Sequence, residues 1–217
     1  MCGRFALNES PAKLASHFNL TGEVGLSPSW NIAPSTRICS ITADESEVRH
    51  LRMMTWGLIP SWAGDEDGGK KFSNARGETV AEKTSFRSAL RNRRCIIPAS
   101  GFYEWKTANG VKQPWYISLK SGEPMAFAGI WETWNDIRAC CIITTSANSL
   151  MEPIHDRMPL ILDPGQWESW LSPQTKYKNT LLQMIRPHDS ESMQAWPVSR
   201  ELNRVGLRDD AGLIEQV

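Results

Sequence analysis

The sequence of 217 residues lacks a long hydrophobic run. No stretch approaches the ~20 consecutive apolar residues that a membrane-spanning helix needs, and the first five residues, Met-Cys-Gly-Arg-Phe, lack the apolar core of a secretory signal. Hydrophobic residues make up 41% of the chain and charged residues 22%, which indicates a globular rather than a disordered protein. We therefore expect an intracellular, cytoplasmic protein with no membrane partner.

The chain also lacks the cysteine patterns of structural metal sites and of disulfide-rich proteins. Its five cysteines include no CxxC pair, and no histidine lies at ligand spacing from them. An odd cysteine count in a reducing compartment argues against a disulfide framework. We therefore predict no metal site and no cofactor. Four cysteines lie in apolar, strand-like stretches and are expected to be core residues: Cys39, Cys95, Cys140 and Cys141.

Net charge is absent as well, because 24 Lys and Arg balance 24 Asp and Glu. The whole molecule is therefore not a generic polyanion binder. The charges are nevertheless uneven, since segment 70–94 carries eight basic residues against Glu78 and Glu82. This segment could form a phosphate-facing surface, although a solvated helix face explains the pattern somewhat better. The eight are Lys70, Lys71, Arg76, Lys83, Arg87, Arg91, Arg93 and Arg94.

No repeat or linker divides the chain, and the polar loop 64–71 is too short to separate domains, so we expect one domain over residues 1–217. Ser10 and Pro11 predict the start of a helix that runs to Phe18. Helical spacing predicts a second helix over 78–91, with Arg87, Arg91 and Arg94 near one face. Asp163-Pro164 is typical of the cap of a third helix, and a fourth is expected over 175–185.

Several segments rich in β-branched, aromatic or apolar residues lie between turn signals. They predict strands over 38–43, 48–56, 94–98, 114–119, 125–131 and 139–145. These strands are interrupted by few helices and do not alternate regularly with them. The pattern predicts a mixed α+β fold with an antiparallel sheet or an open, barrel-like core and several flanking helices.

Cys2 is the most informative single residue. Removal of the initiator methionine ahead of a small residue would expose a 1,2-aminothiol, whose reference pKa values are ~7.7–8.0 for the amine and ~8.5 for the thiol. An aldehyde would form an imine with the amine, and the thiol would close it into a saturated thiazolidine that no longer promotes β-elimination. A retained Met1 would make the α-nitrogen an amide and block this chemistry. A cysteine in a disordered terminus is the alternative interpretation.

Further motifs follow along the chain: Trp-Asn-Ile-Ala-Pro at 30–34, Trp-Gly-Leu-Ile-Pro-Ser-Trp at 56–62, Asn-Ala-Arg-Gly-Glu-Thr at 74–79, Pro-Ala-Ser-Gly-Phe-Tyr-Glu-Trp at 98–105, Ile-His-Asp-Arg-Met-Pro at 154–159 and Trp-Pro-Val-Ser at 196–199. Together with the first five residues, they resemble the SOS-response-associated peptidase (SRAP) family, whose members crosslink to abasic sites in single-stranded DNA. The resemblance runs from residue 1 to about Ser199, and the number of motifs found in the same order makes it specific.

The resemblance implies a set of catalytic residues. Cys2 would be the nucleophile, with its amine attacking first, and Asn74 would position the N-terminus and the opened sugar. Glu104 would transfer protons during imine formation or hold the amine, and His155 would act as acid and base in opening the sugar ring. Taken singly, Asn74 is explained as well by a turn or cap, Glu104 by a strand surface and His155 by a turn.

The resemblance also implies the DNA contacts. Arg4, Arg76 and Arg157 would grip phosphates, while Pro34, Trp62 and Trp105 would stack on or wedge between bases. Close relatives carry a second aromatic residue after the position of Trp62, where this chain has Ala63, so the stacking surface is expected to be smaller. The expected partner is single-stranded DNA with an abasic site, bound by a monomer that joins the nucleoid when on DNA.

Two other functions remain open. A thiol peptidase or N-terminal-nucleophile amidohydrolase could use Cys2, His155 and Glu104, with an activity that is general or limited to removal of Met1. The sequence contains no strong oxyanion-hole signature in its support. A non-catalytic nucleic-acid or protein-binding module is the third reading, and it predicts that a Cys2→Ala variant keeps all activity.

Overall fold

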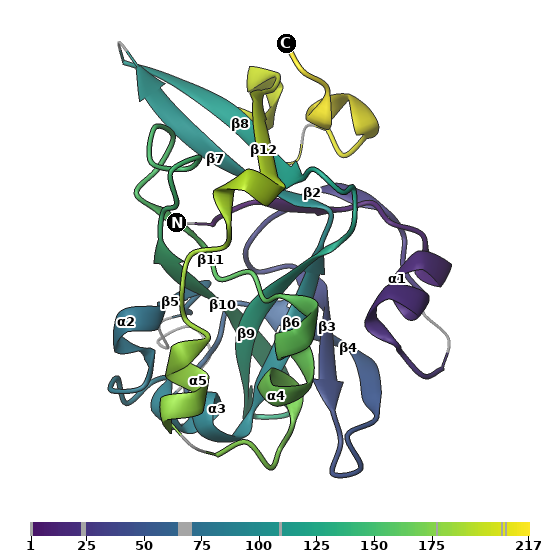
Figure 1. Cartoon of the computed structure of the whole chain (residues 1–217), viewed down its shortest axis with the longest axis vertical. Coiled ribbons are helices and arrows are strands. Elements are labelled where there is room, and N and C mark those ends of the chain that lie inside the picture. The colour runs from purple at the N-terminus through teal and green to yellow at the C-terminus, as the bar shows by residue number, and fades with distance from the viewer. Residues whose placement is uncertain are drawn as a thin grey trace.

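A five-stranded sheet forms one layer of the protein, and the first strand of the chain is one of its inner strands (Figure 1). The computed structural model describes residues 2–22, 25–64, 71–108, 110–176, 178–204, 206 and 208–217. The strands of this sheet are β1 (Phe5–Leu7), β2 (Ser29–Ile32), β7 (Gly101–Ala108), β8 (Val111–Leu119) and β12 (Met193–Pro197), in the order β12-β8-β7-β1-β2. All neighbours are antiparallel. Because β1 lies between β7 and β2, the residues just before it are drawn into the interior.

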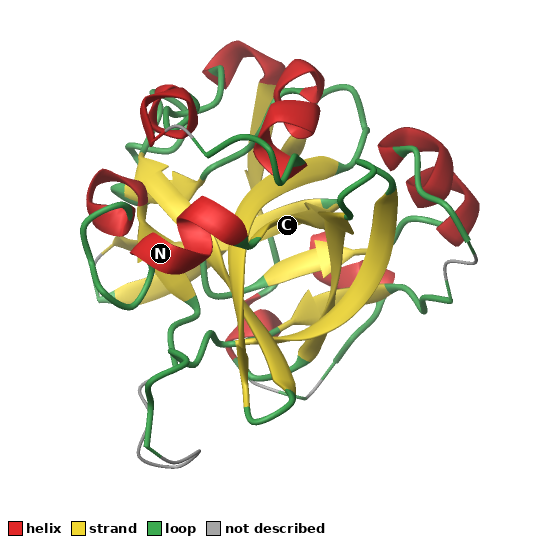
Figure 2. Ribbon diagram, turned by 90° about the horizontal axis from the view of Figure 1, so that it is seen from below, coloured by secondary structure: helices red, strands yellow, loops and turns green. Residues whose placement is uncertain are grey.

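The second sheet closes on itself. Its ring consists of β3 (Arg37–Ala43), β4 (Arg49–Trp56), β6 (Arg94–Ala99), β9 (Met125–Trp134) and β10 (Ile137–Ser146). The ring closes because β9 pairs with both β6 and β10 (Figure 2). Two short strands, β5 (Asn74–Arg76) and β11 (Arg157–Pro159), flank the carboxyl end of β10. This barrel-like core and its flanking helices confirm the expected mixed α+β class.

Apolar and aromatic side chains fill the barrel and join it to the first sheet. The four cysteines predicted for the core are all buried. The barrel is so crowded at Gly129 that an added Cβ would lie 2.8 Å from the Sγ of Cys95. Phe5 of β1 meets Trp56 of β4 at 5.2 Å between ring centroids, and it meets Phe127 of β9 at 6.0 Å. These contacts fix β1 against the barrel.

The helices agree with the sequence at one end of the chain and differ in the middle. Helix α1 (Pro11–Phe18) begins as predicted, with the Ser10 side chain accepting the Lys13 N–H at 3.2 Å. The single helix expected over 78–91 is wrong. Two short helices, α2 (Gly77–Val80) and α3 (Arg87–Asn92), replace it because the chain turns over 81–86 and places buried Phe86 against Phe72, 5.1 Å between centroids.

Arg94 corrects the expected basic helix face. It begins strand β6, and its buried guanidinium donates to the backbone oxygens of Leu90, Arg91, Trp170 and Ser172 at 2.6–2.8 Å. Burial lowers the pKa of Arg94 to about 10. This arginine therefore stabilises the interior through its hydrogen bonds. Of the predicted basic face, only Arg87 and Arg91 are exposed.

The C-terminal half contains the other helices. The capping box of Asp163 and Gln166 starts the 3₁₀ turn η1 (Pro164–Gln166), which leads into α4 (Trp167–Leu171), as the sequence indicated. Helix α5 (Lys178–Gln183) lies inside the predicted range 175–185. Three further 3₁₀ turns follow: η2 (Ser190–Ser192), η3 (Arg200–Asn203) and η4 (Ala211–Ile214). In the described ranges, no helix is long and apolar enough to cross a membrane.

Candidate active site

Cys2 lies just before β1 and is fully buried. Asn74, the first residue of β5, donates its amide to the backbone oxygen of Cys2 at 2.9 Å. The other amide atom, Asn74 Oδ1, is buried and has no hydrogen-bond partner among the described residues. The start of the chain is thus part of the folded interior, which excludes the alternative of a disordered terminus.

A carboxylate and an imidazole lie beside Cys2. Glu104 comes from β7 and is 3% exposed, and its Oε2 lies 4.0 Å from the Nε2 of His155. Burial raises the pKa of Glu104, and the opposing effect of nearby positive charge, including that of His155, is smaller. A buried carboxyl in this state can accept and return a proton closer to neutral pH than an exposed glutamate can.

The ring of His155 has a defined orientation. Its Nδ1 accepts the backbone N–H of Arg157 at 2.9 Å, so the neutral ring carries its proton on Nε2, toward Glu104. The exposed carboxylate of Asp156 also lies 2.9 Å from Nδ1. A carboxylate and an N–H cannot both bond to one nitrogen in one protonation state. The Arg157 contact suits the neutral ring, and the Asp156 contact suits the protonated ring.

Arg157 supports the turn that holds His155. Its guanidinium pairs with both oxygens of Glu78 at 2.6 and 2.9 Å, and it donates to the Thr144 backbone oxygen at 2.7 Å. The hydrogen bonds from Arg157 lower the pKa of Glu78. Arg157 therefore joins α2 to β10, and a phosphate would have to compete with Glu78 for it.

A cleft of about 550 Å³ opens over this group. Glu104 and His155 line it together with two residues predicted to contact DNA, Arg4 and Trp105. The predictions did not include the rest of the lining: Thr107, Lys112, Leu202 and Asn203. Arg76 is exposed at the end of β5. Pro34 and Trp62 do not line this cleft; Pro34 lies between β2 and β3, and Trp62 follows β4 and is 65% exposed.

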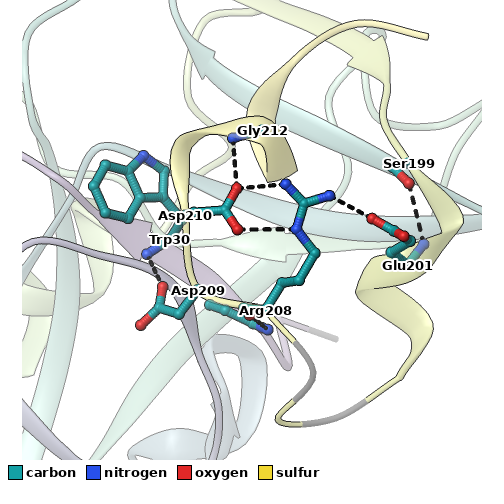
Figure 3. Close-up of polar contacts among 8 residues, drawn as sticks. Trp30, Ser199, Glu201, Arg208, Asp209, Asp210 and Gly212 are labelled. Atoms are coloured by element: carbon teal, nitrogen blue, oxygen red, sulfur yellow. Dashed lines mark hydrogen bonds and ion pairs between the residues drawn. The ribbon is translucent and has the colours of Figure 1, made fainter.

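The C-terminal segment bonds to β2, and β2 in turn bonds to Arg4 at the cleft. Figure 3 shows Arg208 between Asp210 and Glu201, with Asp209 accepting the backbone N–H of Trp30. The backbone oxygen of Arg208 accepts the Nδ2 of Asn31 at 2.7 Å. This bond orients the Asn31 amide so that its Oδ1 faces Arg4, whose Nη1 donates to it.

Arg4 is 8% exposed, and its Nε is buried with no partner in the described part of the chain. Burial lowers its pKa. A second contact fixes the indole of Trp105, whose Nε1 donates to the Oδ1 of Asn203 at 2.6 Å. Asn31 is inside a motif noted in the sequence, whereas Asn203 and Arg208 carry no local signal, since their contacts span about half the chain or more.

Burial, followed by the negative charge of Glu104, raises the pKa of the Cys2 thiol, and the positive charge of the chain's amino group and a backbone hydrogen bond from Arg4 have smaller, opposite effects. The thiol is therefore protonated at neutral pH. No group of three His, Cys, Asp or Glu side chains in the described ranges is arranged to hold a metal ion. The candidate site thus combines the buried Cys2 with a buried carboxyl and an imidazole, and the latter two line a cleft that also carries Arg4 and Lys112; Cys2 itself is not among the described residues that line that cleft.

The fold and this site define the class of protein. The SOS response associated peptidase (SRAP) family matches residues 1–205, and the chain belongs to this family. It is 45% identical over 212 residues to the abasic site processing protein YoqW of Bacillus subtilis (strain 168), with 94% of each chain covered.

More distant relatives have the same kind of name. The chain is 29% identical over 230 residues to the abasic site processing protein YedK of Escherichia coli (strain K12), with both chains fully covered. It is 32% identical over 212 residues to the abasic site processing protein HMCES of Xenopus tropicalis, covering 81% of this chain and 62% of that protein. A crystal structure of a protein from Bacteroides thetaiotaomicron superposes with a TM-score of 0.88 at 28% identity over the whole of both chains.

Proposed function

We propose that this chain processes abasic sites in single-stranded DNA by joining the aldehyde of the lesion covalently to Cys2. The relatives named above are abasic site processing proteins, and the site offers the groups that such a reaction needs. The observation that carries the proposal is the placement of Cys2. Asn74 holds its backbone at 2.9 Å, and a buried glutamate and a histidine lie 4.0 Å apart beside it.

The reaction proceeds in three steps. His155 transfers the proton that opens the closed sugar to its aldehyde. The α-amine, freed when Met1 is removed, adds to the aldehyde carbon, and water leaves with a proton supplied by Glu104. The Cys2 sulfur then bonds to the imine carbon while its proton passes to the nitrogen. One water is released in total, and the saturated ring leaves the DNA strand intact.

The raised pKa of Cys2 fits this order of events. A neutral buried thiol is a poor first nucleophile, but it can close the ring once the imine is formed. The neutral amine therefore makes the first bond. Asn74 keeps the backbone of Cys2 fixed, and its free Oδ1 can receive the hydroxyl of the opened sugar.

The DNA strand would lie over the cleft. We assign phosphate contacts to Arg4 and Arg76 and, in competition with Glu78, to Arg157. Trp105 would stack on a base at the cleft, with Pro34 and Trp62 acting on bases farther along the strand. One domain over residues 1–217, acting as a monomer without a cofactor, would suffice for this reaction.

The same observations bear on the peptidase alternative. Reactive thiol nucleophiles have a lowered pKa, usually beside a cation or a helix N-terminus. Burial and Glu104 act in the opposite direction on Cys2. A general thiol peptidase is therefore the weaker candidate, and self-removal of Met1 is the form of it that the geometry leaves open.

The test is to incubate the protein with single-stranded DNA that carries one abasic site and to weigh the heat-stable product. Cys2→Ala and an N-terminally extended form, in which the Cys2 nitrogen stays in a peptide bond, are the controls. We expect an adduct one water lighter than the sum of the two molecules, with an uncut strand, in the wild type alone. An adduct with Cys2→Ala, or strand cleavage, would contradict the mechanism, and hydrolysis of peptides by Cys2 would favour the peptidase.

A further inference from the structure

A second cleft, of about 420 Å³, lies between helices α3 and α5, apart from the candidate active site. Its floor is apolar, with Leu90 and Leu181 buried at 3% and 1% exposure. Ser88 and Asn92 add hydrogen-bonding groups at the rim. The complete lining is Ala81, Arg87, Ser88, Leu90, Arg91, Asn92, Lys176, Lys178 and Leu181.

Four exposed cations surround this cleft: Arg87 and Arg91 from α3, and Lys176 and Lys178 at the start of α5. None of the described residues that line it is acidic. Within the described ranges, none of these four side chains forms an ion pair or a hydrogen bond. The neighbouring Arg93, by contrast, pairs with Glu132 at 2.7 Å. Like charges around one cavity repel one another, and a bound anion would relieve this repulsion.

The cleft lies one short helix away from the candidate active site. Asn74 and Arg76 occupy β5, α2 follows at once, and Ala81 after α2 lines the cleft. Helix α2 also touches the segment after α5, since a Cβ on Gly77 would lie 2.3 Å from the Cγ2 of Ile185. Three strand residues and four helical residues extend about 16 Å at most. At the ~3.4 Å rise of stacked nucleotides, that distance corresponds to about five nucleotides at most.

We propose that this cleft binds the sugar–phosphate backbone of the DNA strand that flanks the lesion, an inference that rests on the proposed function. The exposed Arg76 marks the direction, because it stands at the end of β5 between the site and α2. The cations bind phosphates, and the leucine floor accommodates the apolar face of a deoxyribose. An acidic protein segment is the competing occupant. DNA is favoured because the strand bound at the proposed active site would already pass Arg76 on its way to this cleft.

The test compares two abasic oligonucleotides with the lesion at the central nucleotide: one of about five nucleotides, which extends about two nucleotides to each side and stays at the active site, and one of about 15, which extends about seven and reaches the cleft. The cleft variant is Arg87→Ala/Arg91→Ala. The matched control is Arg52→Ala/Arg138→Ala, which removes the same charge from exposed, unpaired residues of β4 and β10. Thermal unfolding of both variants checks that they are folded.

We expect all three proteins to bind and crosslink the short oligonucleotide alike. With the long one, the cleft variant alone should bind several-fold more weakly, and its slope of log K against log salt should fall by about 1.4, the value for two lost single-strand phosphate contacts. Equal affinity of cleft variant and control for the long oligonucleotide would overturn the inference. So would binding of an acidic glutamate-rich peptide that the cleft variant loses while its DNA affinity is unchanged.

The two proposals fail separately. If wild type crosslinks neither oligonucleotide, the proposed function is wrong and the inference falls with it. If the short oligonucleotide crosslinks normally while the long one shows no dependence on Arg87 and Arg91, the proposed function stands and only the second site is lost.

Discussion

The barrel wall and the surroundings of Cys2 differ in how completely their buried polar atoms are hydrogen-bonded. In the barrel wall, Arg94 finds four backbone oxygens, and Ser40 meets the Sγ of Cys140 at 3.7 Å. Near the candidate site, Arg4 Nε at the cleft, Asn74 Oδ1 beside Cys2 and Arg157 Nε after His155 are buried without partners in the part of the chain that the structure describes. Unsatisfied buried polar atoms cost free energy. Arg93 Nε and Trp115 Nε1 lack partners among the described residues as well, so the contrast concerns Arg94 and the residues near Cys2. Arg94 stabilises the fold, whereas Arg4 and Asn74 carry the atoms that the proposed function assigns to a ligand.

The cysteines show that thiol acidity does not separate the two regions. Burial raises the pKa of Cys39 and of Cys140 to about 12, and it raises the pKa of Cys2 as well. What distinguishes Cys2 is its position next to the chain terminus and beside Asn74 and Glu104. The proposed mechanism accordingly starts from the amine and its neighbours rather than from a preformed thiolate.

The largest effect should separate Cys2 from the barrel cysteines. We expect Cys2→Ala to abolish crosslinking to abasic DNA, because both the ring sulfur and the closure step are lost. Cys140→Ala should crosslink normally but lose about 1–3 kcal/mol of unfolding free energy, since it leaves a cavity in a filled barrel. Gel-resolved crosslinking and denaturant unfolding check the two variants. Loss of crosslinking by Cys140→Ala at unchanged stability would show that Cys2 is not distinct from the barrel cysteines.

Glu104→Gln should slow crosslinking by about 10²-fold, a typical loss for an acid–base group. The same variant should be more stable at neutral pH. The folded-state pKa of Glu104 is raised, so the fold loses stability as the carboxyl ionises, and glutamine removes that loss. A gain of ~1 kcal/mol corresponds to about 2–4 °C in Tm for a chain of this size.

This gain in Tm should shrink as the pH falls toward ~4, where the carboxyl of the unfolded chain is protonated too. Thermal unfolding from pH 4 to pH 8 measures it, and single-turnover crosslinking gives the rate. A variant that is both less stable and inactive would show that Glu104 is structural.

Asn31→Ala should weaken binding of single-stranded DNA by about 10-fold, or about 1.4 kcal/mol, without changing the crosslinking rate at saturating DNA. The reason is that Asn31 orients the guanidinium of Arg4 and touches no reacting atom. In an Arg4→Ala background the Asn31 substitution should add almost nothing. Full additivity in this double-mutant cycle, measured by fluorescence anisotropy, would contradict the inference that Asn31 acts through Arg4. Asp44→Ala, which removes a hydrogen-bonding turn side chain outside the candidate site, is the control.

The smallest effect on DNA chemistry is expected from Arg94→Met. Four backbone oxygens would lose their donor, so the unfolding free energy should fall by about 3–5 kcal/mol. Crosslinking at 20 °C, well below the lowered Tm, should remain at the wild-type rate. Loss of crosslinking by a variant that is still folded would place Arg94 in the site.

The sequence predicted the elements that have one continuous local pattern. Strands β3, β4, β6, β8, β9 and β10 and helix α1 all contain such a pattern. The helix expected over 78–91 failed because Phe86 packs against Phe72, a contact that no local periodicity records. Strand β7 was missed because it begins with Gly101 and carries the buried charge of Glu104.

The site follows the same rule. The motifs singled out Cys2, Asn74, Glu104 and His155 one segment at a time, whereas the distances between these residues depend on how the two sheets meet. Asn203 and Arg208 could not be anticipated, because they act on β7 and β2 from the other end of the chain.

The position of β1 between two other strands has a mechanical consequence. A DNA strand attached at Cys2 would transmit tension along β1, which is bonded to β2 on one side and to β7 on the other. Force along a strand held on both sides loads its hydrogen bonds together, in shear, instead of peeling them apart in turn. The aromatic contacts of Phe5 with Trp56 and Phe127 would carry part of that load into the barrel. A terminus in this position can serve as a tether that withstands pulling by machinery moving along the DNA.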